Sequence, residues 1–219
     1  MQHLGVIMDG NGRFGVQKYG ERSLGYTDGA KALVRAVKDF SELPLKYLTV
    51  YAFSTENNKR KKEEVSNIFN TIAYFLKYEI YPLLLEKSIG VRFIGDLDGI
   101  QAELKEIVRS APELSGEKTL IIAINYGGLN EIVRTTKKIF ELGKEITEKT
   151  IREFSDLQGI PDPDAIIRYG GYRRLSNFLP MQSIYSELFF TDKKWPEYEK
   201  KDFQDIIEQY ETIKRNFGE

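Results

Sequence analysis

Cysteine is absent from the 219-residue sequence, and histidine occurs once, at His3. Without cysteine the chain can form neither disulfides nor thiolate metal sites, which suits a cytoplasmic protein. With a single histidine, nucleophilic catalysis by Ser–His or Cys–His pairs is poorly supported. We interpret His3, which precedes the first apolar run, as a surface or strand-edge residue. Any chemistry must therefore use arginine, carboxylate and hydroxyl groups or a metal ion.

The sequence also lacks an excess of charge of one sign, because 32 Lys and Arg residues nearly balance 33 Asp and Glu residues. No overall field therefore attracts nucleic acid, and any anion-binding site must be local. No apolar run approaches the ~20 residues of a membrane helix, and the N-terminus has no secretory signal pattern. We expect a cytoplasmic protein that meets any lipid-like substrate by peripheral contact with a membrane surface.

Short apolar runs alternate with helical patterns, and the length suits a single domain over residues 1–219. The runs expected to form strands are Leu4–Met8, Tyr47–Phe53, Val91–Ile94, Leu120–Ile124, Ala165–Arg168 and Glu187–Phe190. They are apolar almost throughout, as strands covered on both faces are. The alternation predicts an α/β fold with a mainly parallel central sheet flanked by helices. In such sheets ligands bind beyond the carboxyl ends of the strands.

Helices are expected between these strands. Apolar residues recur at helical spacing between Ala30 and Phe40. The other predicted helices are Glu63–Glu86, Glu103–Ala111, Asn130–Leu142 and Lys201–Phe217. Pro82 is expected to end or kink the longest of them. The same helix carries the aromatic stretch Phe69–Leu85, which either lines an apolar groove or belongs to the core.

The first polar cluster, Asp9-Gly10-Asn11-Gly12-Arg13, follows the first predicted strand. Glycines let backbone N–H groups approach an anion, the start of a helix adds positive potential, and a guanidinium suits phosphate. Asp9 would repel a bare phosphate, but it fits if Mg²⁺ lies between the acid and the phosphate. The alternative is a tight turn with an incidental acid, since D-G and N-G are common in turns.

Three further polar clusters follow or begin later strands. Residues 53–60 (FSTENNKR) come after the second strand, where a helix-capping loop is the plain interpretation. Residues 168–178 hold three arginines, two glycines and a serine, which indicates an anion site or a solvated basic loop. Glu187 begins the last strand, where an acid needs a partner or a metal. Two anion sites and one metal site together indicate diphosphate chemistry.

These clusters together resemble the cis-prenyltransferases, the family of undecaprenyl diphosphate synthases. The matching stretches occur in family order over nearly the whole chain: MDGNGR, YAFSTEN, VRFIGDL, INYGG, RRLSNF, SIYSEL and FFTDKKWPEYEKKDF. The resemblance implies a homodimeric α/β fold with an apolar tunnel between the sheet and two helices. It also implies Mg²⁺-dependent condensation of an allylic diphosphate with isopentenyl diphosphate, which forms a cis-polyprenyl diphosphate.

The resemblance implies a role for each matching residue. Asp9 would serve Mg²⁺ and ionisation of the allylic diphosphate, with Asn57 near the proton-transfer step. The residues implied in holding the allylic diphosphate are Gly10, Asn11, Gly12, Arg13, Arg22 and Tyr26. The loop that orders over the substrates would include Ser54, Glu56, Asn57 and Arg60. Arg168, Arg174 and Ser176 would bind isopentenyl diphosphate, and Glu187 would be a further metal ligand.

Several positions depart from the family pattern and cluster around both diphosphate sites. Tyr26 stands where the family has histidine, Asn58 where it has an aromatic residue, and Tyr172 where it has an acid. Further departures are Phe14 in place of tryptophan and Pro180-Met181 in place of Leu-Trp. These changes resemble an atypical branch of the family that uses dimethylallyl diphosphate as acceptor and joins chains other than head to tail.

The sequence therefore leaves several functions open. They are ordinary chain elongation, the atypical condensation, a non-catalytic partner subunit, and a polyprenyl-diphosphate carrier without chemistry. Asp9, Asn11, Arg13 and Glu187 are all retained, which favours an enzyme over a partner subunit. Bulky aromatic side chains in the long helix point to a short or medium product: Phe69, Tyr74, Phe75 and Tyr78.

Overall fold

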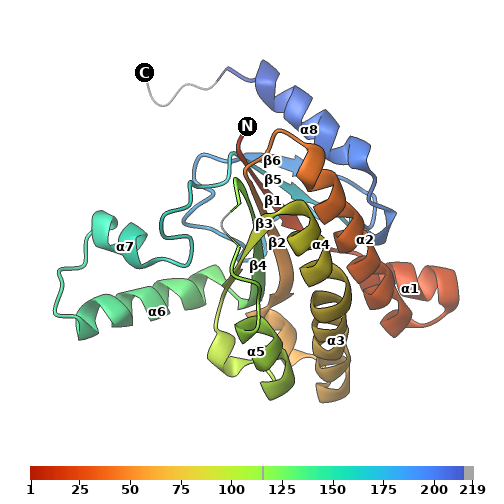
Figure 1. Ribbon diagram of the computed structural model, residues 1–219, viewed down its shortest axis with the longest axis horizontal. Helices are drawn as coiled ribbons and strands as arrows, with labels where there is room; N and C mark the ends of the chain where they lie inside the picture. The colour runs from red at the N-terminus through yellow and green to blue at the C-terminus, as the bar shows by residue number, and fades with distance from the viewer. Residues whose placement is uncertain (115, 215–219) are drawn as a thin grey trace.

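A six-stranded parallel sheet forms the centre of the protein in a computed structural model, which describes residues 1–114 and 116–214 (Figure 1). The strands are β1 (His3–Ile7), β2 (Tyr47–Ser54), β3 (Ile89–Ile94), β4 (Lys118–Tyr126), β5 (Ala165–Arg168) and β6 (Glu187–Phe190). Their order is β3-β4-β2-β1-β5-β6, and every neighbouring pair is parallel. The predicted α/β fold is confirmed, and each predicted strand forms with bounds that move by at most two residues.

The helices connect these strands. They are α1 (Asn11–Tyr19), α2 (Arg22–Glu42), α3 (Lys62–Phe75), α4 (Tyr81–Lys87), α5 (Ala102–Arg109), α6 (Gly128–Glu141), α7 (Glu148–Phe154) and α8 (Lys200–Thr212). The sequence did not predict α7, because seven residues with two apolar side chains give no helical stripe. It begins instead at a local capping box formed by Thr147 and Thr150. The predicted end of the last helix, residues 215–217, lies outside the described residues.

The long predicted helix departs from regular α-helix just before its proline. A π-helical segment, Leu76–Ile80, separates α3 from α4, and Pro82 lies in the first turn of α4. The helical backbone continues across this segment, because Ile80 and Tyr81 are both α-helical and the Tyr81 N–H donates to the Leu76 carbonyl. The helix therefore does not end at Pro82, and the departure from a regular α-helix is the π-helical segment that precedes the proline.

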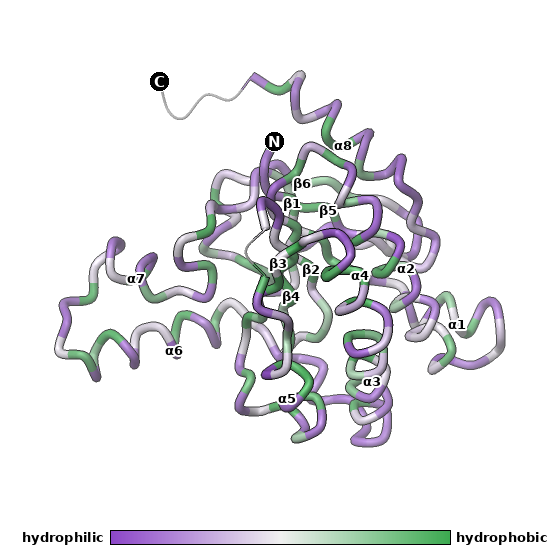
Figure 2. The backbone as a smooth tube through the Cα atoms, in the orientation of Figure 1, coloured by the Kyte–Doolittle hydropathy of each residue, from purple (hydrophilic) through white to green (hydrophobic). Residues whose placement is uncertain are grey.

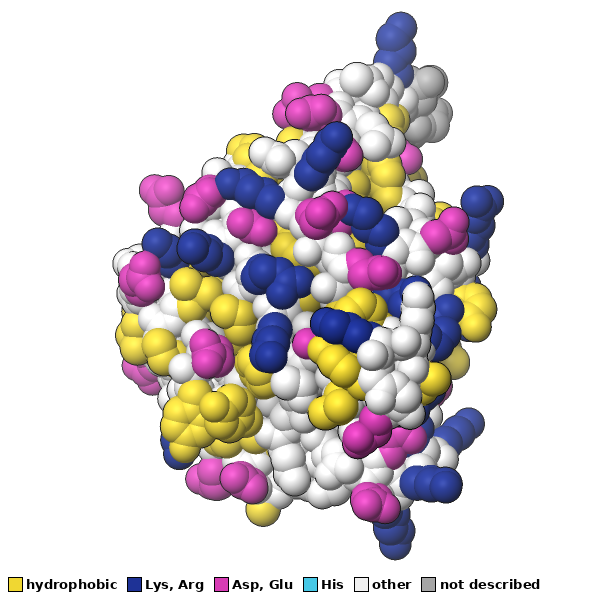
Figure 3. All heavy atoms as spheres, turned by 90° about the vertical axis from the view of Figure 1, so that its right-hand side faces the viewer, with side chains coloured by type: hydrophobic (Ala, Val, Ile, Leu, Met, Phe, Trp, Pro, Cys, Tyr) yellow, Lys and Arg dark blue, Asp and Glu magenta, His cyan; other side chains and the backbone are white. Residues whose placement is uncertain are grey.

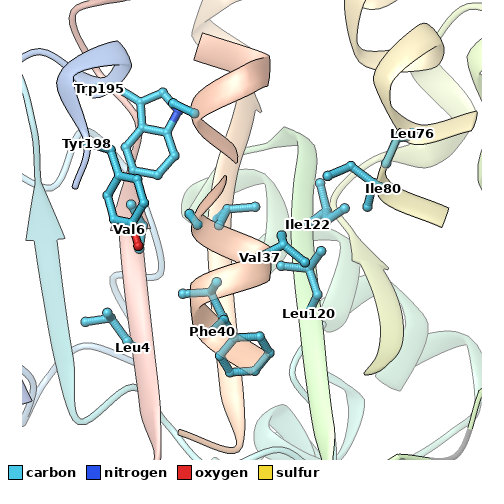
Figure 4. Packing of buried hydrophobic residues seen from close by; sticks show 14 of the residues in the cluster. Leu4, Val6, Val37, Phe40, Leu76, Ile80, Leu120, Ile122, Trp195 and Tyr198 are labelled. Atoms are coloured by element: carbon cyan, nitrogen blue, oxygen red, sulfur yellow. The ribbon is translucent and has the colours of Figure 1, made fainter. Parts of the chain in front are cut away.

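Apolar side chains fill both faces of the sheet. Figure 2, which colours the backbone by residue hydropathy, shows hydrophobic residues along the central strands. The larger core packs α2, α3, α4 and α8 against alternate strand residues such as Leu4 and Val6. Figure 4 shows the part of it in which Val37 and Phe40 of α2 lie over the sheet. The Trp195 indole contributes to this core and donates a 2.8 Å hydrogen bond to the carbonyl of Gly29. The smaller core, on the other face, lies under loop residues that include Leu157 and Phe178.

His3 is fully buried in β1, so its interpretation as a surface or edge residue was wrong. Its Nδ1 lies 2.6 Å from the carbonyl oxygen of Pro161, which can only accept, so Nδ1 carries the proton. Nε2 then accepts from the hydroxyl of Thr49 at 2.7 Å. Burial lowers the pKa of His3 from 6.5 to about 4. The imidazole is therefore a neutral structural group.

The surface is of mixed charge, as expected from the composition. On the face shown in Figure 3, basic and acidic side chains are interspersed over α1, α2 and α3. Within residues 1–114 and 116–214, no helix combines the length and the apolar character needed to cross a membrane.

Candidate active site

The polar clusters converge at one edge of the sheet because the strands that precede them are in register. Ile7, near the end of β1, pairs with Tyr51 of β2 on one side and with Arg168 of β5 on the other. The segments after these three strands therefore surround one pocket of about 750 Å³. Its lining includes the predicted residues Asp9, Gly10, Asn11, Gly12, Arg13, Arg22, Tyr26, Ser54, Glu56, Asn57, Arg60, Arg168, Arg174 and Ser176.

The loop after β1 turns sharply into α1. Gly10 has φ of 101°, in the left-handed region that favours glycine, and an added Cβ would lie 2.8 Å from the side chain of Lys194. The turn brings the Gly10 N–H to Oδ1 of Asp9 at 2.6 Å. It also begins α1 at Asn11, whose side-chain amide donates to the carbonyl of Met8 at 3.0 Å. The unpaired N–H groups of the first turn of α1 thus lie beside Asp9.

Two arginines from different elements meet the Asp9 carboxylate. Arg168 donates to Oδ2 of Asp9 at 2.8 Å, and Arg13 lies 3.4 Å from Oδ1. Only 5% of the Arg168 side chain is exposed, and its other terminal nitrogen donates to the Arg174 carbonyl at 2.6 Å and to the Ser176 hydroxyl at 2.7 Å. Arg168 therefore fixes the course of the loop that follows β5.

A second charged cluster closes the opposite side of the pocket. The Tyr26 hydroxyl donates to Oε1 of Glu64 at 2.5 Å and accepts from Arg22 at 3.1 Å and from Arg60 at 2.9 Å. Both arginines also lie 3.1 Å from the same Glu64 oxygen. Burial and the hydrogen bond to Glu64 raise the pKa of Tyr26 above its ordinary value of 10.0. The phenol is therefore a neutral donor at physiological pH.

The hydrogen bond from Tyr26 lowers the pKa of Glu64 against the opposing effect of burial. Sequence reasoning missed Glu64, because nothing in the local sequence shows that the start of α3 packs against α2. The only local indication is its position four residues after Arg60, a spacing that permits an ion pair on a helix.

The loop after β2 is held to both neighbouring loops. Its backbone begins with Ser54, whose N–H donates to Oδ1 of Asn57 at 3.2 Å. The Glu56 carboxylate accepts from the side chain of Asn177 at 2.7 Å, which links this loop to the one after β5. Asn58, which departs from the family pattern, donates to Oδ1 of Asn125 at 2.8 Å. The amide of Asn58 thus ties the loop to the end of β4.

An apolar cavity of about 80 Å³ continues from the polar pocket between the sheet, α2 and α3. The two share Met8, Asn11, Tyr26, Ala52 and Ile68. The further lining of the cavity is Gly29, Ala30, Leu33, Thr71, Ile72, Phe75, Leu76, Ile80, Ile122 and Trp195. This is the place predicted for an apolar tunnel. A molecule with an anionic head and an apolar tail fits the pair of spaces.

Of the four aromatic residues expected to narrow this space, one lines the cavity. Phe75 faces it, whereas the rings of Phe69 and Phe53 pack together in the core with centroids 4.5 Å apart. Tyr74 and Tyr78 are 54% and 55% exposed on the outside of the helix. Neither tyrosine lines this cavity, but Tyr74 and Phe75 together line a neighbouring groove between α2 and α3, and their ring centroids lie 5.5 Å apart. The expectation that these aromatic residues shorten the product stays a prediction.

Glu187, expected as a further metal ligand, does not line the pocket that Asp9 lines in this chain. It begins β6 and pairs with Ala165, at the amino end of β5, whereas the pocket lies beyond Arg168 at the carboxyl end. In a parallel sheet these ends are opposite edges. Among the described residues no group of three or more acidic or histidine side chains forms a metal site.

The fold and the site define a class of protein, an α/β protein in which an arginine-rich pocket and an apolar cavity adjoin at the carboxyl edge of a parallel sheet. Residues 7–218 match the family described as putative undecaprenyl diphosphate synthase, and the chain belongs to this family. It is a prenyltransferase.

Relatives and solved structures agree with this membership. An isoprenyl transferase of Thermotoga maritima is 42% identical over 99% of this chain and 96% of its own length. Lavandulyl diphosphate synthase of Lavandula x intermedia, solved with dimethylallyl diphosphate, superimposes with a TM-score of 0.92 at 29% identity over 100% of this chain and 98% of its own. A probable undecaprenyl diphosphate synthase of Campylobacter jejuni superimposes with a TM-score of 0.84 at 30% identity, over 100% of this chain and 99% of its own.

Proposed function

We propose that the protein condenses an allylic prenyl diphosphate with isopentenyl diphosphate in a Mg²⁺-dependent reaction that yields a cis-polyprenyl diphosphate of short or medium length. The observation that carries this proposal is the polar pocket of about 750 Å³, with arginines on both sides of Asp9, which continues into the apolar cavity. The first can hold two diphosphates. The second adjoins a groove of about 770 Å³ between α2 and α3, with which it shares Tyr26, Thr71 and Phe75, and the two together provide surface for a prenyl tail.

The allylic diphosphate is proposed to lie at the start of α1 with its tail in the cavity. As its C–O bond stretches, negative charge gathers on the leaving diphosphate. The N–H groups of the first turn of α1 and the guanidinium of Arg13 stabilise that charge. The proposed second diphosphate lies on Arg168, Arg174 and Ser176. That contact aims the double bond of isopentenyl diphosphate at the allylic carbon, an effect of orientation.

Asp9 is the residue whose chemistry fits Mg²⁺. A magnesium ion bound through diphosphate oxygens needs one or two carboxylates from the protein, and Asp9 supplies one with 30% of its side chain exposed in the pocket. When bound there, Mg²⁺ supplies positive charge that offsets the diphosphate. Asp9 is paired with Arg168 at 2.8 Å, so the residue would exchange part of that pairing for the metal. Glu187 does not fit such a site within one chain.

A product assay tests the proposal. Purified protein is incubated with Mg²⁺, a panel of allylic diphosphates and labelled isopentenyl diphosphate, and products are identified by mass spectrometry and NMR. We expect short or medium cis-polyprenyl diphosphates. Absence of turnover with every pair would contradict the proposal and revive the partner-subunit and carrier alternatives.

One observation favours a second candidate, the use of dimethylallyl diphosphate as acceptor. The TM-score of 0.92 belongs to a lavandulyl diphosphate synthase bound to that compound. The loop that departs most from the family, Gly170-Gly171-Tyr172, lies beside the proposed acceptor site. The same assay distinguishes the candidates, because labelled dimethylallyl diphosphate would enter branched products only in the second.

We also propose a homodimer. Apolar side chains are exposed on α6, including Leu129 at 69% and Phe140 at 78%, and at the edge strand β6, including Phe190 at 38%. Burial of such a surface against a second copy is favourable. Sedimentation of the purified 25.3 kDa chain measures its oligomeric state.

Vesicle co-sedimentation in the presence of product tests the proposed peripheral membrane contact.

A further inference from the structure

The ring of Tyr172 lies within reach of three guanidinium groups. The central guanidinium carbons of Arg174, Arg13 and Arg168 are 4.2, 4.8 and 5.7 Å from its centroid. All three distances lie within the range of cation–π attraction, which is about 6 Å. The arginines come from three places in the chain: α1, the end of β5, and the loop after it. One aromatic ring therefore gathers cations that the sequence separates by up to 161 positions.

Two glycines set the position of this ring. Gly170 and Gly171 have φ of 90° and 81°, in the region that favours glycine. Their N–H groups donate to the carbonyls of Lys193 at 2.7 Å and Thr191 at 2.9 Å. Arg13 donates to the carbonyl of Gly170 at 2.7 Å, and a Cβ at Gly170 would lie 2.7 Å from that same nitrogen of Arg13. The glycine pair thus lets Arg13 approach the loop just where Tyr172 follows.

Core packing does not explain where the ring lies, because 43% of Tyr172 is exposed in the wall of the pocket. The charges of the three arginines around the ring explain its position. Three like charges around one pocket repel one another, and in the described part of the chain Asp9 pairs with Arg168 and Arg13 but no carboxylate pairs with Arg174. The negative face of an aromatic ring attracts cations and leaves their formal charge in place.

We propose that Tyr172 is a positioning residue that holds Arg13, Arg168 and Arg174 converged on the diphosphate site while leaving their positive charge available to the ligand. This rests on the proposed function, because it assumes that these arginines bind diphosphate. A carboxylate at position 172, as in the family pattern, would also gather the arginines but would cancel one of their charges. The tyrosine therefore gives this chain a more cationic acceptor site than that pattern provides.

Binding of inorganic pyrophosphate, measured by calorimetry in a chelating buffer without divalent metal, tests the proposal. Tyr172→Phe keeps the ring and is expected to bind within about twofold of the unaltered protein. Tyr172→Leu removes the ring and is expected to weaken binding by about three- to tenfold. Tyr172→Glu is expected to weaken it further, because the carboxylate neutralises a cation. Tyr78→Leu, at a similarly exposed ring on the outer helix surface, is the matched control and should leave binding unchanged.

A double-mutant cycle separates positioning from general structural damage. If the ring acts through the arginine nearest to it, the effects of Tyr172→Leu and Arg174→Lys are not additive. Equal binding by the Leu variant and the unaltered protein would overturn the proposal. So would a Phe variant as weak as the Leu variant, since the hydroxyl would then be responsible. Failure of the unaltered protein to bind pyrophosphate both without metal and with Mg²⁺ would instead overturn the proposed function. If the Leu variant does not fold, Tyr172→Met takes its place.

Discussion

The hydroxyl of Tyr26 donates a 2.5 Å hydrogen bond to the Glu64 carboxylate, and that carboxylate oxygen also lies 3.1 Å from both Arg22 and Arg60. The contact joins α2 to the start of α3 and to the loop after β2. It occupies two arginines that the resemblance assigns to the substrates. Glu64 therefore competes with any diphosphate for the same guanidinium groups.

Replacement of Glu64 by glutamine should tighten the binding of pyrophosphate by about two- to fivefold, because it frees Arg22 and Arg60 from a partly exposed ion pair. Calorimetry measures the change. Glu63→Gln removes the same charge from the same helical turn, where the side chain is exposed, and serves as the control. Equal effects of the two variants would show that only net charge matters and would contradict the competition.

Replacement of Tyr26 by histidine should introduce a new step into the pH profile of kcat/KM. The pKa of Tyr26 is raised above 10.0 by burial and by Glu64, so the phenol stays neutral from pH 6 to 9. A histidine has an ordinary pKa of ~6.5 and would titrate within that range. Tyr26→Phe should show no such step. A step already present in the unaltered protein and lost in the Phe variant would contradict this assignment.

Replacement of Asp9 by asparagine should lower turnover by about 10²-fold or more, a typical loss when a charge-stabilising group is removed. Binding provides a sharper measurement. Without metal, the variant should bind pyrophosphate more tightly than the unaltered protein, because a like charge is gone. With Mg²⁺ present, the unaltered protein should instead bind pyrophosphate more tightly than the variant. Asp98→Asn, at an exposed aspartate in the turn after β3, is the control. If Mg²⁺ strengthens pyrophosphate binding by the Asn variant as much as by the unaltered protein, Asp9 is excluded as the metal ligand.

Replacement of Phe75 by alanine should lengthen the product, because this side chain lines the apolar cavity beyond the pocket. Tyr78→Ala, at an exposed ring that lines neither the cavity nor the groove between α2 and α3, should leave the product unchanged. Chromatography and mass spectrometry of the reaction products compare the two variants. An unchanged product from the Phe75 variant would mean that the tail lies elsewhere.

The stability of the protein should fall as the pH decreases from 6.5 to 4, owing to His3. Its pKa is lowered to about 4 by burial, so in this interval the unfolded chain binds a proton that the folded chain does not. The difference corresponds to about 3 kcal/mol of unfolding free energy, present above pH 6.5 and lost below pH 4. Urea unfolding across this range should show a weaker pH dependence for His3→Gln. If the unfolding free energy of both proteins depends on pH in the same way, His3 is excluded as the cause of the loss of stability.

Much of the site was predictable because its residues follow strands that share one direction. Asp9, Ser54 and Arg168 each stand at or just beyond the carboxyl end of a strand, and parallel strands bring those ends to one edge. The same reasoning could not place Glu187, because the sequence shows that a residue begins a strand but the sheet decides which edge that start occupies. The same reasoning could not predict the burial of His3, because that burial depends on the place of β1 between β2 and β5 inside the sheet.

The sequence alone determined the parallel α/β architecture, the absence of cysteine chemistry and the motifs that assign the family. These follow from the types of residue and their spacing along the chain, which are local properties of the sequence. Only the tertiary structure decided that Tyr172 meets Arg13 and Arg174, that Glu64 holds Tyr26, and that Phe75 rather than Tyr74 faces the cavity. Each of these depends on how separate elements pack against one another, and a contact between distant segments has no local signal in the sequence.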